Sequence, residues 1–217
     1  MTDATTDATT DATTKPRVLL PLFLDLSGKD VLVVGAGVVA TRKVTDLVAA
    51  GATVRVVAPR VTDELMALTG KGAAKAATAG SATGSITVEQ RGFEEKDIEG
   101  AWLVFASTDD AAVQQRVAVA SDRARVFCVA IDDPPNASAY GGGIVRRGPV
   151  TIAISTSGEA PALARLLREI LEQALPDEGF VDAARALREK WKADKTPMAS
   201  RFGELVQAFK ERSSPKP

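Results

Sequence analysis

A glycine-rich turn between an apolar run and a helix-compatible segment constrains this chain more than any other feature. The apolar run covers residues 31–34, the turn reads GAGVVA at residues 35–40, and the helix-compatible segment covers residues 41–50. In such a unit the first glycine permits the turn, the second lets the backbone approach a pyrophosphate, and a small third residue lets helix and strand pack closely. Free N–H groups at the helix N-terminus would hold the pyrophosphate. The pattern predicts a dinucleotide-binding unit, and a glycine turn that only packs is the alternative.

The predicted second strand covers residues 53–57 and leads to Pro59 and Arg60. A unit that binds NAD usually carries Asp or Glu near this point, where the carboxylate bonds the ribose hydroxyls. The next acid here is Asp63, and Arg60 could instead pair with the 2′-phosphate of NADP. In the alternative interpretation, backbone groups alone hold the adenosine and Arg60 is solvated. The residues by themselves fit NAD and NADP equally.

Composition narrows the functional classes. The formal net charge of −1 and the lack of a basic run argue against a nucleic-acid-binding protein. Histidine is absent and cysteine occurs once, as Cys128 in an apolar run, so we expect no metal ligands and a core cysteine. Proton transfer must then fall to carboxylates, lysine, tyrosine or water. No apolar stretch approaches membrane-spanning length, so we expect a cytoplasmic protein that does not bind membranes.

The middle of the chain predicts an α/β fold with a Rossmann-type parallel sheet. Further strands are expected over residues 86–89, 102–106 and 125–131, a loop insertion over 69–85, and a helix from a cap at 107–110 to about residue 120. The ligand of such a sheet lies beyond the carboxyl ends of its strands. Each of Gly35, Pro59, Thr108 and Asp132 follows a predicted strand, so we expect all four at one edge of the sheet.

The rest of the chain is different in kind. A sixth strand is expected over residues 150–154, and a core helix with a solvated side begins at Pro161, the helix position that proline tolerates best. Two more helical patterns lie between Phe180 and Phe209. We therefore predict a disordered tail (1–15), a dinucleotide-binding Rossmann domain (16–141), a small dimerisation segment (142–175) and a C-terminal helical domain (176–217).

Several motifs together resemble the precorrin-2 dehydrogenase and sirohydrochlorin ferrochelatase family, the dehydrogenase–chelatase module of sirohaem synthases. The matching blocks are Pro21–Leu24, Val34–Lys43, Val56–Pro59, Ala106–Asp110, Phe127–Cys128, Ile131–Asp132, Val150–Ser155 and Pro161–Glu169. The resemblance implies NAD⁺ as the oxidant of precorrin-2, a homodimer formed through the central segment, and Asp132 as the catalytic carboxylate. It extends to insertion of ferrous iron as a second substrate. The stretch Tyr140–Gly143 departs from the family pattern, which leaves the chelatase activity open.

Chemistry makes the role of Asp132 reasonable, because oxidation of precorrin-2 removes a hydride and a proton. On the residues alone Asp133 is an equal candidate, and a turn before Pro134 is the structural alternative for either. The substrate is a polycarboxylated tetrapyrrole, so five arginines are candidate clamps: Arg42, Arg146, Arg147, Arg165 and Arg168. The predicted cofactor-binding residues are Gly35, Gly37, Val38, Val39, Pro59, Arg60 and Thr108. An NAD-binding regulatory module without catalysis is the alternative function.

Overall fold

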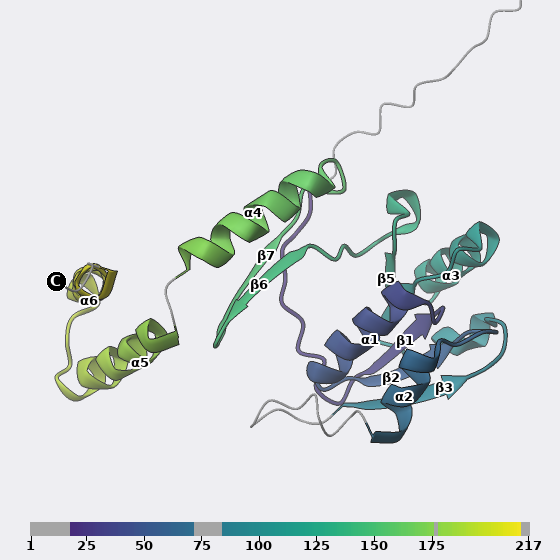
Figure 1. Cartoon of the computed structure of the whole chain (residues 1–217), viewed down its shortest axis with the longest axis horizontal. Coiled ribbons are helices and arrows are strands. Elements are labelled where there is room, and N and C mark those ends of the chain that lie inside the picture. The colour runs from purple at the N-terminus through teal and green to yellow at the C-terminus, as the bar shows by residue number, and fades with distance from the viewer. Residues whose placement is uncertain (1–17, 72–83, 176–177, 214–217) are drawn as a thin grey trace, which may run out of the picture. The chain divides into compact units, whose positions relative to one another are not determined.

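Five parallel strands form the sheet in the first half of the chain (Figure 1). Their order across the sheet is β3 (Ser85–Glu89), β2 (Thr53–Val57), β1 (Asp30–Val34), β4 (Leu103–Ala106) and β5 (Phe127–Ala130). The chain order reverses between β1 and β4, and in an open parallel sheet the ligand crevice lies at this reversal. The predicted Rossmann-type fold is confirmed.

The computed structural model describes residues 18–71, 84–175 and 178–213. The chain divides into two compact units, Met1–Tyr140 and Gly141–Pro217. The predicted tail over residues 1–15 lies outside the described residues, and so does most of the predicted loop insertion. The finer division into three domains stays a prediction.

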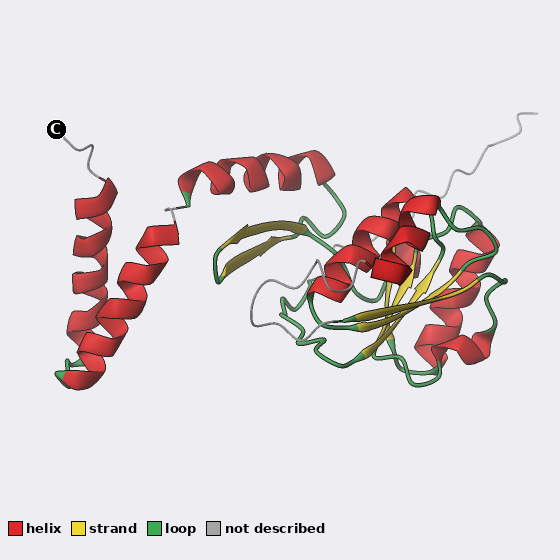
Figure 2. Ribbon diagram, turned by 60° about the horizontal axis from the view of Figure 1, so that its bottom comes forward, coloured by secondary structure: helices red, strands yellow, loops and turns green. Residues whose placement is uncertain are grey.

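Helices cover both faces of the sheet (Figure 2). On one face, α1 (Val38–Ala49) and α2 (Asp63–Lys71) pack against the strand residues that include Val31, Val33 and Val54. On the other face, α3 (Ala111–Arg123) and the short 3-10 helix η1 (Glu95–Ile98) pack against Leu32 and Val34. Successive side chains of a strand point to opposite faces, so a sheet covered on both sides needs the unbroken apolar runs that its central strands carry.

Several element bounds differ from the sequence expectation. The helix α1 begins at Val38, inside the glycine motif, because Gly37 is its N-cap. The helix α2 was not predicted; it begins with two acids, Asp63 and Glu64, that suit the positive end of a helix, and it extends into the expected loop. The strand β5 is shorter than predicted. Arg125, expected to begin it, has a positive φ of 58° and belongs to the turn between α3 and β5.

The second unit begins with an antiparallel hairpin of β6 (Gly143–Arg147) and β7 (Val150–Ile154), of which only β7 was predicted. The helix α4 (Pro161–Ala174) begins at its proline as expected, but none of its residues is buried, so the expected core helix is wrong for the single chain. The helices α5 (Glu178–Ala193) and α6 (Met198–Ser213) complete the unit. No described helix combines the length and hydropathy needed to cross a membrane.

Candidate functional site

The turn after β1 requires glycine at its first position. Gly35 has a φ of +108°, a backbone conformation that residues with a side chain rarely adopt. A Cβ on Gly35 would stand 2.0 Å from the carbonyl oxygen of Ser107. The Gly35 N–H donates to the Val57 oxygen at 2.9 Å, so the turn is also tied to the end of β2. The first glycine thus lets the ends of β1 and β4 meet.

The second glycine has a different surrounding. Gly37 is the N-cap of α1 with a φ of −79°, and a Cβ built on it would meet nothing within 4 Å. No side chain caps this helix end and its first turn has no acid, while the following Val38 and Val39 are exposed. The first N–H groups of a helix lack partners within the helix, so they suit an anion that approaches this open space.

Partly buried contacts of the Thr41 hydroxyl fix the start of α1. The Thr41 hydroxyl donates to the Gly37 carbonyl at 3.0 Å and lies 3.3 Å from the Thr62 hydroxyl oxygen. Ala40, in the place of the third glycine, is fully buried, as close packing of helix and strand requires. Contacts within the chain therefore fix the start of α1 beside the turn.

Pro59 and Arg60 follow β2 and are both exposed. The segment they belong to is fixed to the turn, because the Thr62 N–H donates to the Ala36 oxygen at 3.3 Å. In the described part of the chain Arg60 has no ion pair and no hydrogen bond of its side chain. A guanidinium in this state is available to a ligand.

Thr108 lies in the loop between β4 and α3, beside the glycine turn. Its N–H points to the Oε1 atom of Gln114 at 3.5 Å, and its hydroxyl accepts from the Asp110 N–H at 3.3 Å. Asp110 caps α3, since its Oδ1 accepts from the N–H groups of Ala112 and Val113. Sequence reasoning expected this cap but missed Gln114, a buried glutamine on the same helix face as Val117.

Asp132 and Asp133, the two competing acids after β5, have different surroundings. Asp133 is half-buried, and its Oδ2 accepts from the Asn136 side chain at 2.7 Å. Asp132 is exposed, and no hydrogen bond or ion pair joins its carboxylate to another described residue. Its φ of +55° is uncommon for a residue with a side chain, and such strain gathers at functional sites.

The five arginines that are candidates for binding the substrate carboxylates fall into two groups, those with partners among the described residues and those without. The guanidinium of Arg147 donates to the backbone oxygens of Glu172 (2.7 Å) and Leu175 (3.3 Å), where it closes the end of α4. Arg165 pairs with Glu169 and Arg168 with Glu172 along the helix surface. Within the described residues Arg42 and Arg146 are exposed and have no such partners. These two are therefore the candidates that could bind a carboxylate without first breaking a contact.

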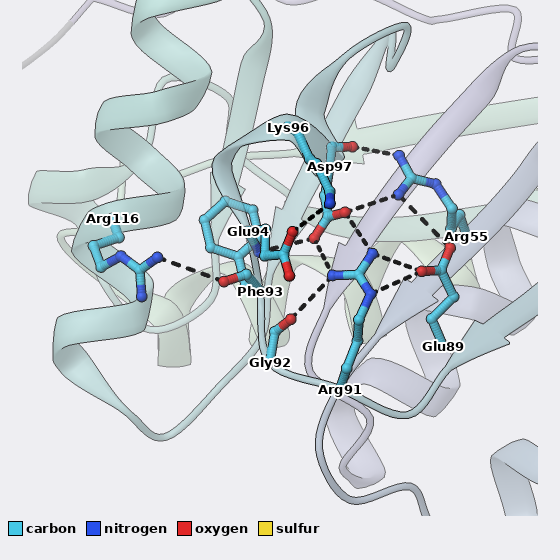
Figure 3. Close-up of polar contacts among 9 residues, drawn as sticks. All are labelled: Arg55, Glu89, Arg91, Gly92, Phe93, Glu94, Lys96, Asp97 and Arg116. Atoms are coloured by element: carbon cyan, nitrogen blue, oxygen red, sulfur yellow. Dashed lines mark hydrogen bonds and ion pairs between the residues drawn. The ribbon is translucent and has the colours of Figure 1, made fainter.

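A second polar cluster surrounds Asp97 on the α3 side of the sheet (Figure 3). The Asp97 side chain is only 2% exposed, and it accepts from Arg91 at 2.6 and 2.8 Å and from the Glu94 N–H at 2.9 Å. Arg55 of β2 pairs with the same carboxylate at 3.4 Å. Burial alone would raise the pKa of Asp97, but the hydrogen bonds and the two positive charges outweigh it and hold that pKa below its usual range.

This cluster is structural, because every one of its charged groups already has a partner. Glu89 at the end of β3 also binds Arg91, at 2.6 Å, so the cluster joins the edge strand to η1. Elsewhere, burial raises the pKa of the Cys128 thiol, as expected for a core cysteine. Among the described residues no group of three or more His, Cys, Asp or Glu side chains is placed to hold a metal ion.

Two segments of the chain match models of known protein families. Residues 22–143 match the family model described as "Putative NAD(P)-binding", and residues 147–174 match "Sirohaem biosynthesis protein central". The fold is similar to that of a solved structure titled "SirC, precorrin-2 dehydrogenase", with a TM-score of 0.67 over 87% of this chain and 88% of that one. At 22% identity this likeness shows the fold alone.

Curated relatives are sirohaem synthases. The chain is 42% identical over 184 residues to siroheme synthase 3 of Aeromonas hydrophila. The aligned region covers 84% of this chain and 37% of the relative. It is 40% identical over 157 residues to the siroheme synthase of Citrobacter koseri, covering 72% of this chain and 32% of the relative. The chain thus spans only about a third of the length of these relatives. The chain belongs to the family described as putative NAD(P)-binding, and its residues 147–174 are similar to the central segment of sirohaem-biosynthesis proteins.

Proposed function

We propose that the chain catalyses the NAD⁺-dependent oxidation of precorrin-2 to sirohydrochlorin in the cytoplasm. The reaction removes two electrons and two protons from the tetrapyrrole: one hydrogen leaves as a hydride and the other as a proton. Bound NAD⁺ would accept the hydride. The chain must then bind the cofactor, hold the substrate against it, and supply an acceptor for the proton.

The observation that carries the proposal is the contrast between the two acids after β5. Asp132 follows a strand at the carboxyl edge of the sheet, exposed and without a partner among the described residues, whereas Asp133 is bound by Asn136. A general base needs a free carboxylate within reach of the proton. In a chain without histidine, Asp132 meets that need best.

The other residues of this edge would bind the cofactor. We infer that the N–H groups of Val38 and Val39 hold the pyrophosphate in the open space beside Gly37, where no side chain interferes. Pro59 and Thr108 would flank the nucleotide from the ends of β2 and β4. We infer NAD⁺ rather than NADP⁺ from the motif resemblance at residues 56–59, with Arg60 left in solvent.

Asp132→Asn tests the proposal, with Asp133→Asn as the matched control. The first change keeps the size of the side chain but removes its ability to take a proton, so turnover should fall about 100-fold or more while NAD⁺ affinity stays the same. The control should keep most of the turnover, since it alters a contact of the turn. Near-normal turnover of Asp132→Asn together with loss in Asp133→Asn would assign the base to Asp133.

Insertion of ferrous iron into sirohydrochlorin is the second activity we propose. Metal insertion displaces pyrrole protons, and the same free carboxylate of Asp132 is placed to accept them. The Asp132→Asn variant should therefore lose iron or cobalt insertion together with dehydrogenation. Wild-type protein that oxidises precorrin-2 but inserts no metal would limit the function to the dehydrogenase.

We also propose that the active form is a homodimer joined through the second unit. The helix α4 presents Leu163, Leu166, Leu167 and Ile170, which are 36–52% exposed in the single chain. Contiguous apolar side chains of this kind mark interaction surfaces in soluble proteins. A second copy of the same segment would cover them.

A further inference from the structure

We propose that Gln114 is a positioning residue that holds Asp132 in its left-handed backbone conformation and ties it to the Thr108 loop. The proposal rests on the function proposed above, because it explains how the carboxylate of that reaction is aimed. Gln114 lies outside the motif blocks that the sequence analysis singled out, between Ala106–Asp110 and Phe127–Cys128.

The residue directly before Asp132 is fixed at both of its backbone groups. The Ile131 N–H donates to the Ala106 oxygen at 2.9 Å, which continues the sheet by one residue. The Ile131 oxygen accepts from Nε2 of Gln114, also at 2.9 Å. The first bond holds the Ala130–Ile131 peptide in the sheet, and the second means that the Ile131–Asp132 peptide cannot rotate without breaking its hydrogen bond to Gln114.

Such a restraint is needed at Asp132. A left-handed conformation is unfavourable for a residue with a side chain, although Asp tolerates it better than most. The φ of +55° turns the chain sharply at the end of β5. On the other side of Asp132, the Asp133 backbone oxygen accepts from the Asn136 N–H at 3.1 Å. The free Asp132 side chain thus stands between two fixed points of the backbone.

The chemistry of glutamine suits a bridge of this kind. Its amide offers a donor and an acceptor on one rigid group, and burial makes both expensive to leave without a partner. Gln114 is only 4% exposed; Nε2 serves the loop after β5, while Oε1 faces the Thr108 N–H at 3.5 Å. One side chain of α3 therefore links the loop expected to flank the cofactor to the residue expected to take the proton.

The test compares Gln114→Met with Gln115→Met, the same change one residue along the helix at an exposed position. The three-bond coupling between the amide proton and Hα of Asp132, measured by NMR, reports φ without any substrate. Gln114→Met should change this coupling and lower turnover of precorrin-2 about 10-fold to 100-fold, the scale of a misplaced group, with a smaller effect on NAD⁺ affinity. Gln115→Met should change neither. Should the methionine variant fail to fold, Gln114→Asn keeps a buried amide too short to bridge both loops and should change the coupling in the same direction.

Two results would overturn the proposal. One is an Asp132 coupling that stays the same in a folded Gln114→Met or Gln114→Asn variant. The other is a fall in turnover of the same factor when Gln114→Met is added to Asp132→Asn, because a residue that acts through the carboxylate has nothing left to position in that background. Failure of the proposed reaction would look different: wild-type protein would form no NADH from precorrin-2, yet the coupling would still respond to Gln114→Met.

Discussion

Replacing Gly35 by alanine should destabilise the protein strongly, whereas the same change at Gly37 should leave the fold intact and weaken cofactor binding. At Gly35 two costs combine. The φ of +108° is unfavourable for any residue with a Cβ, at about 1–3 kcal/mol. The new Cβ would also stand 2.0 Å from the Ser107 oxygen and 2.6 Å from its carbonyl carbon, far inside the 3.4 Å at which ordinary contact begins.

The Ser107 backbone has little freedom to move away, because its N–H donates to the Val34 oxygen at 2.8 Å. Overpacking at a fixed site costs about 1–3 kcal/mol, so the total for Gly35→Ala is about 2–6 kcal/mol. That is a large share of the roughly 5–15 kcal/mol by which native proteins are stable. For a chain of this size the melting temperature should fall by about 10 °C.

Gly37→Ala is the matched change. Its φ of −79° suits alanine and its Cβ would meet nothing within 4 Å, so unfolding in urea should differ from wild type by about 1 kcal/mol or less. Calorimetric titration should show NAD⁺ affinity reduced at least about 10-fold, since the methyl group would occupy the space beside the first N–H groups of α1. Equal stability of Gly35→Ala and wild type would refute the packing argument, and unchanged NAD⁺ affinity of Gly37→Ala would refute the placement of the cofactor.

Three further predictions concern other parts of the molecule. Asp97→Asn should lower the free energy of unfolding at neutral pH by about 2–4 kcal/mol, because it removes the charged partner of Arg91 and Arg55. The control is Glu95→Gln, which breaks an exposed ion pair with Arg123 and should cost about 1 kcal/mol or less. Because the pKa of Asp97 is lowered in the folded state, its contribution to stability is complete above the unfolded pKa of about 3.9 and is lost as the pH falls through the folded pKa. The unfolding free energies of the wild type and Asp97→Asn, measured in urea, should therefore converge in strong acid. A difference that stays constant with pH would contradict the assignment. Leu166→Asp should convert a dimer into a monomer in light scattering at micromolar concentration, because Leu166 is 52% exposed on the apolar face of α4; a wild-type monomer would contradict the proposed dimer. Calorimetry should show tighter binding of NAD⁺ than of NADP⁺, with Arg60→Ala leaving the NAD⁺ affinity unchanged; tighter NADP⁺ binding that Arg60→Ala removes would assign Arg60 to a 2′-phosphate instead.

The sheet could be predicted from the sequence because its strands are short apolar runs with turns at both ends. Residues 53–57 were placed at their observed bounds, and the residues expected at strand ends do follow those strands. The strand β6 escaped prediction since it begins at Gly143, after two other glycines, and glycine is uncommon inside strands. The helix α2 was missed because its end merges with an Ala- and Gly-rich segment.

The details of the site depend on contacts that sequence patterns do not contain. The 3-10 helix η2 (Pro134–Asn136) brings the Asn136 side chain back to the Asp133 carboxylate. For this reason, within the described part of the chain, Asp133 is bound and Asp132 is not. The positive φ of Asp132 and its link to Gln114 join residues on separate elements. The only sequence signal for Gln114 is its spacing from Val117 and Ser121, which marks the buried side of α3.

The most direct test of the proposed function is to mix the purified protein with precorrin-2 and NAD⁺ under anaerobic conditions and to follow the absorbance of NADH and of sirohydrochlorin together. The account predicts that both products form in equal amounts, at a rate that Asp132→Asn lowers about 100-fold or more. Protein that binds NAD⁺ tightly yet forms neither NADH nor sirohydrochlorin would contradict the account and would indicate an NAD-binding regulatory module.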